Sequence, residues 1–371
     1  MSPVPWLLAA CLALPTVAWA AEPIRVALHE AAERVEVTGR HGLVVLDLGR
    51  RPLLAVPPGE PVRIAPWRRG LEVGSRRIEL EAVRLEPRSG ALGLGGREYP
   101  GAVEVVRQGA ALLVVNELDL EAYVAGTLRG EVPETWPLET LKAQAVAART
   151  YTVYHQRRSG SRPFHLLAGA TASQEYHGRV PDGSPIWIAV RETRGAILTW
   201  RGEPFPSFYH AESGGWTEPP QAVFAGELPP LPGVRCEFSA DSPHSAWTLA
   251  LPLATLRDLL RKGGLELGEV TALEVIERSP SFRVVQLAVR GSRGAVVLAG
   301  TDFRRLLGPN VLKSTLFTVA LNGRQVRFEG RGWGHGVGLS QYGAKGMAER
   351  GYSFREILEF YYPGTTLERR G

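Results

Sequence analysis

The sequence predicts an α+β fold, in which a β-rich N-terminal region precedes a mixed α/β region built around a buried, alanine-rich helix. Two observations predict it. Residues 23–115 alternate short apolar stretches with Gly and Pro, a pattern typical of strands joined by turns. After residue 116 the apolar positions recur at helical as well as strand spacing. We therefore expect three parts: an export signal over 1–20, a β-rich region over 21–115 and the mixed region over 116–371.

Residues 1–20 have the features of a signal peptide. The apolar core 7–17 is too short to span a bilayer comfortably, and 18–20 provide a small-x-small cleavage site. We expect export to the periplasm or the cell wall. Because the segment has no Lys or Arg, a retained N-terminal membrane anchor is an alternative, and residues 8–11 resemble a lipoprotein cleavage site. Once the signal is removed, Cys236 is the only cysteine, so an internal disulfide is excluded.

The charge pattern argues against nucleic-acid binding. The chain of 371 residues has a formal net charge of +5, and only four of its 43 basic residues are lysines. No basic run is interleaved with aromatic residues. The excess of arginine indicates a GC-rich genome rather than a nucleic-acid surface, and we expect no nucleic-acid partner.

The β-rich region contains six predicted strands. Turns such as those at 57–59 and 88–90 separate them. The predicted strands cover residues 24–30, 34–40, 42–49, 78–86, 102–108 and 111–118.

Two helices follow. Residues 119–128 predict a short amphipathic helix capped by Asp119. A second helix should begin at Pro137, with Thr135 or Trp136 at its cap, and end near residues 158–160. Its many alanines leave little bulk on any side, so other backbone can pack closely around it, as expected of a buried central helix.

The remaining elements alternate between strands and helices. A long loop is expected over 219–233, and we find no internal repeat and no membrane span after the signal. Asn322-Gly323 predicts a hairpin turn, and Ser353 with Glu356 predicts a capping box. The predicted strands cover 189–200, 205–211, 269–278, 282–291, 294–300, 314–323 and 324–332, and the predicted helices 253–260, 301–307 and the segment from 353 to 362.

Glu131 is the candidate catalytic residue. It is expected in a turn just ahead of the alanine-rich helix, where a rigid support would hold it. Its apolar neighbours Val132, Pro133 and Trp136 would raise its pKa toward working pH, as a general acid requires. The alternative is a helix cap or dipole partner, a role that would lower the pKa instead.

The stretch EVPETWPLETLKAQAVAARTY, which starts at Glu131, resembles the signature of the SpoIID/LytB family, the stage II sporulation protein D and amidase-enhancer proteins of bacteria. The resemblance spans roughly residues 110 to 367. Four later stretches match the same family in the same order: 173–178, the run from 192 to 218, 313–317 and 330–367.

The resemblance implies a secreted peptidoglycan lytic transglycosylase in which residues 116–371 form the catalytic region. The substrate would be glycan strands already stripped of peptides, cleaved between MurNAc and GlcNAc to leave anhydro-muramyl ends. One glutamate, matching Glu131, would serve as acid and then as base. The alternative is a non-catalytic wall-binding protein that enhances a cell-wall amidase.

Several other polar residues are expected at the site. Gln174 and Tyr176 are suited to binding sugars, although an ordinary surface turn is an alternative. Arg149 could fix a carboxylate or hydroxyl, or form a structural ion pair.

Glycines at alternate positions from 330 to 338 permit a tight backbone path that would bring His335 and Gln341 to a ligand, or a packed crossing of chains. His210 lies near Ser213, but no G-x-S-x-G elbow supports a hydrolase pair. If the resemblance carries function, one open groove should bring together Glu131 and the residues Gln174, Tyr176, His210, His335 and Gln341.

No metal or cofactor is expected. Some relatives bind zinc with one histidine and two cysteines in the loop ahead of Gln174, but here Ser173 stands where they have cysteine. His165 alone cannot make a tetrahedral site.

Overall fold

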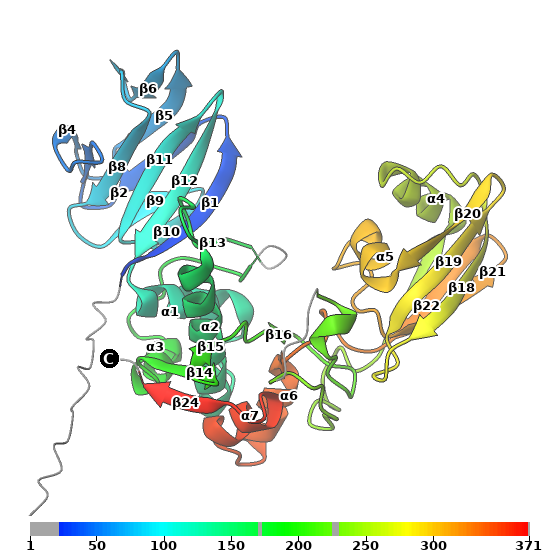
Figure 1. The fold of residues 1–371 in the computed structure, drawn as a ribbon. Helices are drawn as coiled ribbons and strands as arrows, with labels where there is room; N and C mark the ends of the chain where they lie inside the picture. Colours follow the sequence, from blue (N-terminus) through cyan, green and yellow to red (C-terminus); the bar gives the residue numbers. More distant parts are fainter. Residues whose placement is uncertain (1–21, 170–172, 225–229, 370–371) are drawn as a thin grey trace, which may run out of the picture.

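The computed structural model describes residues 22–169, 173–224 and 230–369, which form three lobes (Figure 1). The expected signal over 1–20 lies outside the described residues. Within the described ranges, no helix is long and apolar enough to cross a membrane. The mixture of helices and strands, with a β-rich N-terminal region, confirms the predicted α+β class.

The N-terminal β lobe, residues 22–118, is built from two sheets that enclose a core of buried aliphatic side chains. All six predicted strands are present. The additional strands are short and interrupted by Gly, Arg or Pro, which is why their apolar pattern is weak. The first sheet has the order β13-β1-β12-β11-β8-β3-β4, from Leu166–Leu167, Ile24–Ala32, Ala111–Leu118, Ala102–Gln108, Ala82–Pro87, Leu43–Leu46 and Pro52–Val56. The second has the order β10-β9-β2-β5-β6-β7, from Arg97–Pro100, Ala91–Leu94, Val35–Gly39, Pro61–Trp67, Gly70–Val73 and Arg76–Ile78.

The central helical lobe surrounds α2, Leu138–Arg158. Four alanines of this helix, at 143, 145, 147 and 148, are fully buried, as predicted, and the other helices and β14 pack directly against it. The remaining helices of the lobe are α1 (Leu120–Glu131), α3 (Pro185–Glu192), α6 (Gln341–Glu349) and α7 (Phe354–Tyr361), with a 3₁₀ turn at Pro220–Ala222. Its short strands are β14 (Ala196–Trp200), β15 (Glu203–Pro204), β16 (Tyr209–His210), β23 (Leu339–Ser340) and β24 (Thr366–Arg369).

Two predicted helix caps in this lobe are confirmed, but α1 continues to Glu131 instead of ending at residue 128, and α6 was not predicted. Asp119 caps α1 and Ser353 with Glu356 forms the predicted capping box. The cap of α2 is Pro137 rather than Thr135 or Trp136, and it makes no side-chain hydrogen bond. The strand predicted over 189–200 is wrong in its first half, because Ser184 and Pro185 start helix α3, which runs to Glu192.

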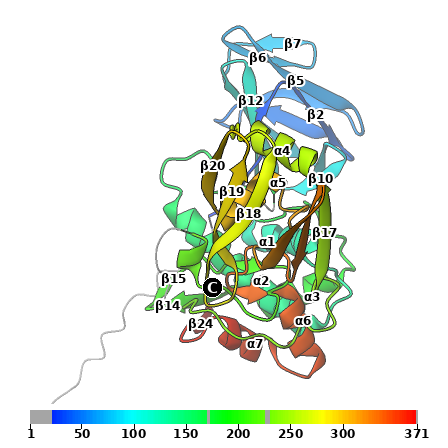
Figure 2. The same ribbon diagram turned by 90° about the vertical axis from the view of Figure 1, so that its right-hand side faces the viewer.

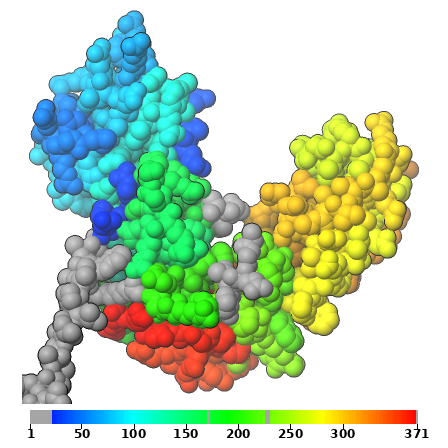
Figure 3. Space-filling view, in the orientation of Figure 1, coloured from blue at the N-terminus to red at the C-terminus, as the bar shows by residue number. Residues whose placement is uncertain are grey.

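The third lobe, residues 247–330, has a hydrophobic core of its own that the sequence analysis did not separate from the central lobe. Two three-stranded sheets and two helices build it (Figure 2). The hairpin at Asn322-Gly323 is confirmed. The elements are β17 (Trp247–Pro252), α4 (Leu253–Lys262), β18 (Val270–Arg278), β19 (Val284–Gly291), β20 (Gly294–Ala299), α5 (Gly300–Leu307), β21 (Phe317–Asn322) and β22 (Gln325–Gly330). In the space-filling view the surface is deeply hollowed between this lobe and the β lobe (Figure 3).

Candidate active site

The Glu131 carboxyl is held by three hydrogen bonds from three separate segments. Its Oε1 accepts from the backbone N–H of Glu175 at 2.8 Å and from the hydroxyl of Tyr209 at 3.4 Å. Its Oε2 accepts from the amide of Gln341 at 3.2 Å. Glu131 is the last residue of α1, so the helix itself, rather than a loop, positions the carboxyl.

Close backbone packing brings the segment 173–177 onto the end of α1. A Cβ atom on Gly130 would lie 2.6 Å from the carbonyl oxygen of Glu175, well inside van der Waals contact. Only glycine therefore lets the Glu175 N–H reach Glu131. This approach is a property of the position before the acid, and it explains why a glycine stands there.

Gln174 is fully buried and orders the residues around the acid. Its amide Nε2 donates to the Tyr209 hydroxyl at 2.8 Å, while its Oε1 accepts from the hydroxyls of Tyr123 and Thr152. With its own proton, the Tyr209 hydroxyl then donates to Glu131. Gln174 is thus a positioning residue one step from the carboxyl, and not a surface turn residue.

Burial is the dominant influence on Glu131. Desolvation raises the pKa of this carboxyl above its usual value, and the negative charge of Glu175 acts in the same direction. The hydrogen bonds from the Glu175 backbone, Gln341 and Tyr209 act against it but leave the net shift upward. An acid that keeps its proton at higher pH is what general-acid chemistry needs, whereas a helix cap would have the opposite shift.

Gln341 is brought to Glu131 by the glycine-rich segment. It is the first residue of α6, whose N-cap Ser340 ends β23, and β23 pairs in parallel with β16. The pairing places Gln341 and Tyr209, which are far apart in sequence, on the same carboxyl. Gln174 and Gln341 are therefore the predicted residues that the structure brings to Glu131.

Tyr176 and Arg149 lie elsewhere. The Tyr176 side chain is buried between Tyr99 and Tyr123, and its hydroxyl donates to Asn116 in the β lobe. It offers no face to a sugar. Arg149 is also fully buried and forms a bidentate ion pair with Glu121, with Nε 3.1 Å from Oε1 and Nη2 2.6 Å from Oε2.

These two side chains therefore take structural positions. Arg149 also donates to the carbonyl of Ala196, so it ties α2 to α1 and to β14. The expected roles of Tyr176 and Arg149 in substrate binding have no geometry to support them, and of the two alternatives for Arg149 the structure has the ion pair.

His210 and His335 lie together on the other side of β16. Side chains alternate along a strand, so Tyr209 faces Glu131 while His210 points away. The two imidazole rings are 5.6 Å apart, and His210 donates from Nδ1 to the Val337 carbonyl. Burial lowers the pKa of both rings, that of His335 to about 3, so both are neutral at physiological pH. Neither contacts the carboxyl, and they pack the glycine-rich loop instead.

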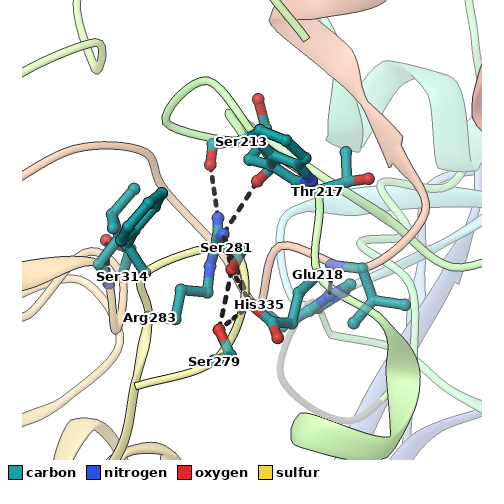
Figure 4. A network of polar contacts seen from close by, with 12 residues as sticks. Ser213, Thr217, Glu218, Ser279, Ser281, Arg283, Ser314 and His335 are labelled. Carbon is teal, nitrogen blue, oxygen red and sulfur yellow. Dashed lines mark hydrogen bonds and ion pairs between the residues drawn. The ribbon is translucent and has the colours of Figure 1, made fainter. Parts of the chain in front are cut away.

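A buried polar network connects the segment 213–218 to the third lobe (Figure 4). The Arg283 guanidinium donates to the carbonyls of Ser213 and Trp216 at 2.5 and 2.9 Å. It also lies 3.8 Å from Glu218, which accepts hydrogen bonds from Ser279 and Ser281. Because the backbone N–H of Glu218 donates to the Gly336 carbonyl, this segment in turn contacts the loop that carries His335.

The described residues of the loop that binds zinc in some relatives make other contacts. His165 accepts the backbone N–H of Arg25 at 3.1 Å, and Ser173 accepts that of Leu167 at 3.3 Å. Within the ranges that the structure describes, no three His, Cys, Asp or Glu side chains are placed to hold a metal ion.

We expect metal removal to leave the protein unchanged. Elemental analysis of purified protein should find less than stoichiometric zinc, because the loop has one histidine and no thiolate. Treatment with a chelator should then change neither the circular dichroism spectrum nor any glycan-cleaving activity. Loss of structure on chelation would show that metal ligands exist where none are expected.

The sequence analysis missed Tyr209 and the Glu175 backbone. The signal for Tyr209 was available, because a strand that includes residues 205–211 must direct Tyr209 and His210 to opposite faces. Nothing local marks the Glu175 N–H, since the donor is a main-chain group and its approach depends on the packing at Gly130. Trp136, which was expected near the site, is half-buried and packs its edge against Tyr342 at 5.0 Å.

Two parts of the chain match described families. Residues 108–200 match SpoIID, stage II sporulation protein, and residues 240–338 match DUF8618, a domain of unknown function. The first match contains Glu131 and Gln174. The second covers the third lobe and most of the glycine-rich loop.

The similarity to individual proteins is longer. An uncharacterised protein of Brachyspira hyodysenteriae is 32% identical over 315 residues, which cover 85% of this chain and 84% of that protein. Stage II sporulation protein D of Bacillus amyloliquefaciens is 32% identical over 286 residues, covering 73% and 80%. Amidase enhancer of Bacillus subtilis is 29% identical over 358 residues, covering 80% of this chain but 49% of that protein.

Proposed function

The chain belongs to the SpoIID family of stage II sporulation proteins, and from that premise we propose that it is an exported lytic transglycosylase of peptidoglycan. Its substrate would be the glycan strand, cleaved between MurNAc and GlcNAc. The products would carry anhydro-muramyl ends.

One observation carries this proposal. A single carboxyl, on Glu131, is desolvated and fixed by donors from three segments. A structural carboxylate in such a position would be expected to pair with a cation, as Glu121 does with Arg149. No such cation faces Glu131 among the contacts of the described residues, and its pKa is raised. These are the conditions under which a carboxyl stores a proton for transfer.

The reaction needs only this one group. Glu131 gives its proton to the glycosidic oxygen as the bond from that oxygen to the muramyl anomeric carbon breaks. The resulting carboxylate then takes a proton from a hydroxyl of the same muramyl residue, whose oxygen bonds to the anomeric carbon and closes the anhydro ring. The proton count of the enzyme is restored, and no water is consumed.

The hydrogen bonds to the Glu131 carboxyl support both proton-transfer steps. Donors from Tyr209, Gln341 and the Glu175 N–H stabilise the carboxylate that forms after the first transfer. Gln174 keeps the Tyr209 hydroxyl aimed at Glu131. The acid is therefore oriented in both protonation states without large movement.

The decisive test is chemical analysis of the products. Purified sacculi, intact or first stripped of stem peptides, are incubated with the protein, and the released material is analysed by mass spectrometry. We expect anhydro-muramyl ends in a time-dependent yield. Reducing muramyl ends would indicate hydrolysis with water, and no release from either substrate would contradict the proposal.

The pH profile tests the role of Tyr209. An acid catalyst must be protonated, so kcat/KM should fall as pH rises through the raised pKa of Glu131. Tyr209→Phe removes a hydrogen bond that lowers this pKa, so the alkaline limb should move to higher pH. The maximal kcat/KM should fall about tenfold, since the carboxylate loses one donor.

The matched control is Tyr154→Phe, a half-buried tyrosine of α2 that stacks with Arg158. This variant should keep the wild-type profile. A loss of rate in Tyr209→Phe with no displacement of the alkaline limb would mean that the hydroxyl does not act on the Glu131 proton.

The second candidate function is enhancement of a cell-wall amidase, which the name of the Bacillus subtilis relative favours. A purified amidase assayed on sacculi with and without this protein separates the two functions. Enhancement that persists in Glu131→Gln, with no anhydro products, would favour the enhancer. Enhancement that requires Glu131 would instead follow from cleavage of the glycan.

A further inference from the structure

Four part-exposed rings form a row that starts beside Glu131 and ends at the third lobe. Trp136, five residues after the acid, contacts Tyr342, whose neighbour Gln341 binds the Glu131 carboxyl. Tyr342 contacts His244 at 5.4 Å between ring centroids, and His244 contacts Trp333 at 4.5 Å. All four residues are half-buried, so the row lies at the surface.

A lysine stands at the far end of this row. The Lys313 ammonium lies over the Trp333 ring, 5.6 Å from its centroid, and 3.5 Å from Nδ1 of His244. Burial, with a smaller contribution from Lys313, lowers the pKa of His244, so this imidazole is neutral and accepts from the ammonium. Backbone bonds fix the arrangement, since the Gly334 N–H donates to the Lys313 carbonyl and the Gly332 N–H to that of His244.

Lys313 differs from the other lysines of the described residues in being half-buried without an anionic partner. Lys142 pairs with Glu139 and Glu192, and Lys345 pairs with Glu349, whereas Lys262 is exposed at the end of α4. Lys313 is half-buried, and no carboxylate of the described residues lies within ion-pair distance of it. A partly desolvated cation without a counter-ion favours the binding of an anionic ligand.

We propose that the row from Trp136 to Trp333, with Lys313, binds the sugar residues next to the scissile bond, and that Lys313 binds the free lactyl carboxylate of a peptide-free muramic acid. The inference rests on the proposed function for its substrate class. It adds the residues that distinguish a stripped strand from one that still carries peptides.

The chemistry of the strand fits both parts of the site. Sugar rings have apolar C–H faces that pack on aromatic side chains, and a continuous row of half-buried rings offers such a surface. The lactyl group of muramic acid is an anion only when no peptide is attached, because the peptide converts it to a neutral amide. Carboxylates at the end of a stem peptide are the other source of negative charge, and the experiment below separates the two.

Binding is measured in the Glu131→Gln background, so that no turnover occurs, by calorimetry with three tetrasaccharides. The first is peptide-free GlcNAc-MurNAc-GlcNAc-MurNAc, the second is the same compound with stem peptides, and the third is chitotetraose, which has no carboxylate. We expect Lys313→Gln to weaken binding of the first about tenfold or more, since a charge-assisted hydrogen bond is lost. Binding of chitotetraose should change less than about twofold.

Lys262→Gln is the matched control and should bind all three ligands as the parent does. The inference is overturned if Lys313→Gln and Lys262→Gln bind the peptide-free tetrasaccharide equally, or if the parent does not bind it. It is also overturned if Lys313→Gln weakens only the peptide-bearing ligand, because the anion would then be a peptide carboxylate.

The aromatic part has its own readout. Trp136→Ala should weaken binding of chitotetraose and of the peptide-free tetrasaccharide by the same factor, roughly fivefold or more, because stacking does not depend on charge. Unchanged binding of both would remove the row from the site. These binding results do not depend on cleavage. A wild-type protein that releases no anhydro products would contradict the proposed function, but the binding measurements would still test this inference.

Discussion

Replacing Glu131 with Gln is expected to reduce the release of anhydro-muramyl products by about a hundredfold or more. Glutamine has the same shape but no transferable proton, so both the protonation of the glycosidic oxygen and the later deprotonation of the muramyl hydroxyl fail. The remaining rate would come from binding and from the donors that surround the position. The measurement is the initial rate of product formation, followed by mass spectrometry of released fragments.

The fold should tolerate this change. The side-chain carbonyl oxygen of the introduced glutamine can accept from the Glu175 N–H and from Tyr209, as Oε1 of the acid does. The new amide can donate to Gln341 once the Gln341 amide turns over. The melting temperature should therefore stay within a few degrees of wild type, and lost activity can be assigned to the missing proton.

The control is Glu134→Gln, in the turn that follows α1. Glu134 is exposed and accepts a hydrogen bond from the Ser184 hydroxyl, which glutamine can also accept. This variant should cleave at the wild-type rate. Cleavage near the wild-type rate by Glu131→Gln would contradict the transglycosylase proposal, and equal losses in both variants would mean that the turn as a whole, rather than one carboxyl, is needed.

The sequence predicted those parts of the site that depend on local signals. Glu131 and the buried alanine helix beside it were identified from a single continuous stretch, because a proline and a run of alanines are local properties, although the predicted cap was wrong. Gln174 and Gln341 were also predicted, from their residue types and the glycine pattern together with the family resemblance. Their actual roles, one supporting Tyr209 and the other donating to Glu131, depend on segments that are joined only by the tertiary fold.

The histidines show where a motif is insufficient. His210 and His335 occur in a polar, glycine-rich context that is typical of binding sites, and both were expected in the groove. The strand β16 directs His210 away from the acid, and burial keeps both rings neutral. Sequence shows that an imidazole is present, but the side of the strand on which it lies decides what it can contact.

The third lobe was predicted element by element but not as a unit. Its strands and helices have clear periodicity, so their existence could be inferred. Their separation from the central lobe depends on which apolar faces meet, which a strand pattern does not specify. The lobe contributes Lys313, which contacts Trp333 and His244 just outside the two ends of the lobe. None of these three residues stood out from its local sequence.

The buried connection between this lobe and the glycine-rich loop predicts a large effect on stability. Arg283 is fully buried and faces Glu218, and a Cβ atom on Gly336 would lie 2.6 Å from the guanidinium. Each group compensates for the desolvation of the other, together with the carbonyls of Ser213 and Trp216. Removing one partner leaves the other as an uncompensated buried charge.

Arg283→Met should therefore lower the free energy of unfolding by about 3–5 kcal/mol, since methionine fills much of the space but offers neither charge nor donors. The measurement is urea unfolding followed by tryptophan fluorescence, with Trp216 and Trp333 close to the network as reporters. The control is Arg290→Met on the neighbouring strand β19, where an exposed arginine lies 3.7 Å from Glu274. That change should cost less than about 1 kcal/mol.

A double variant distinguishes charge compensation from packing. If the loss in Arg283→Met arises because the Glu218 carboxylate is left buried without a cation, adding Glu218→Gln should restore part of the stability. The double variant would then lose less unfolding free energy than the sum of the two single variants. If the loss arises from packing, the costs should add. A decrease of less than about 1 kcal/mol in Arg283→Met itself would show that the third lobe is held to the glycine-rich loop by other contacts. The backbone bonds that join residues 313–316 to 331–334, such as Gly334 N–H to the Lys313 carbonyl, would be among those contacts.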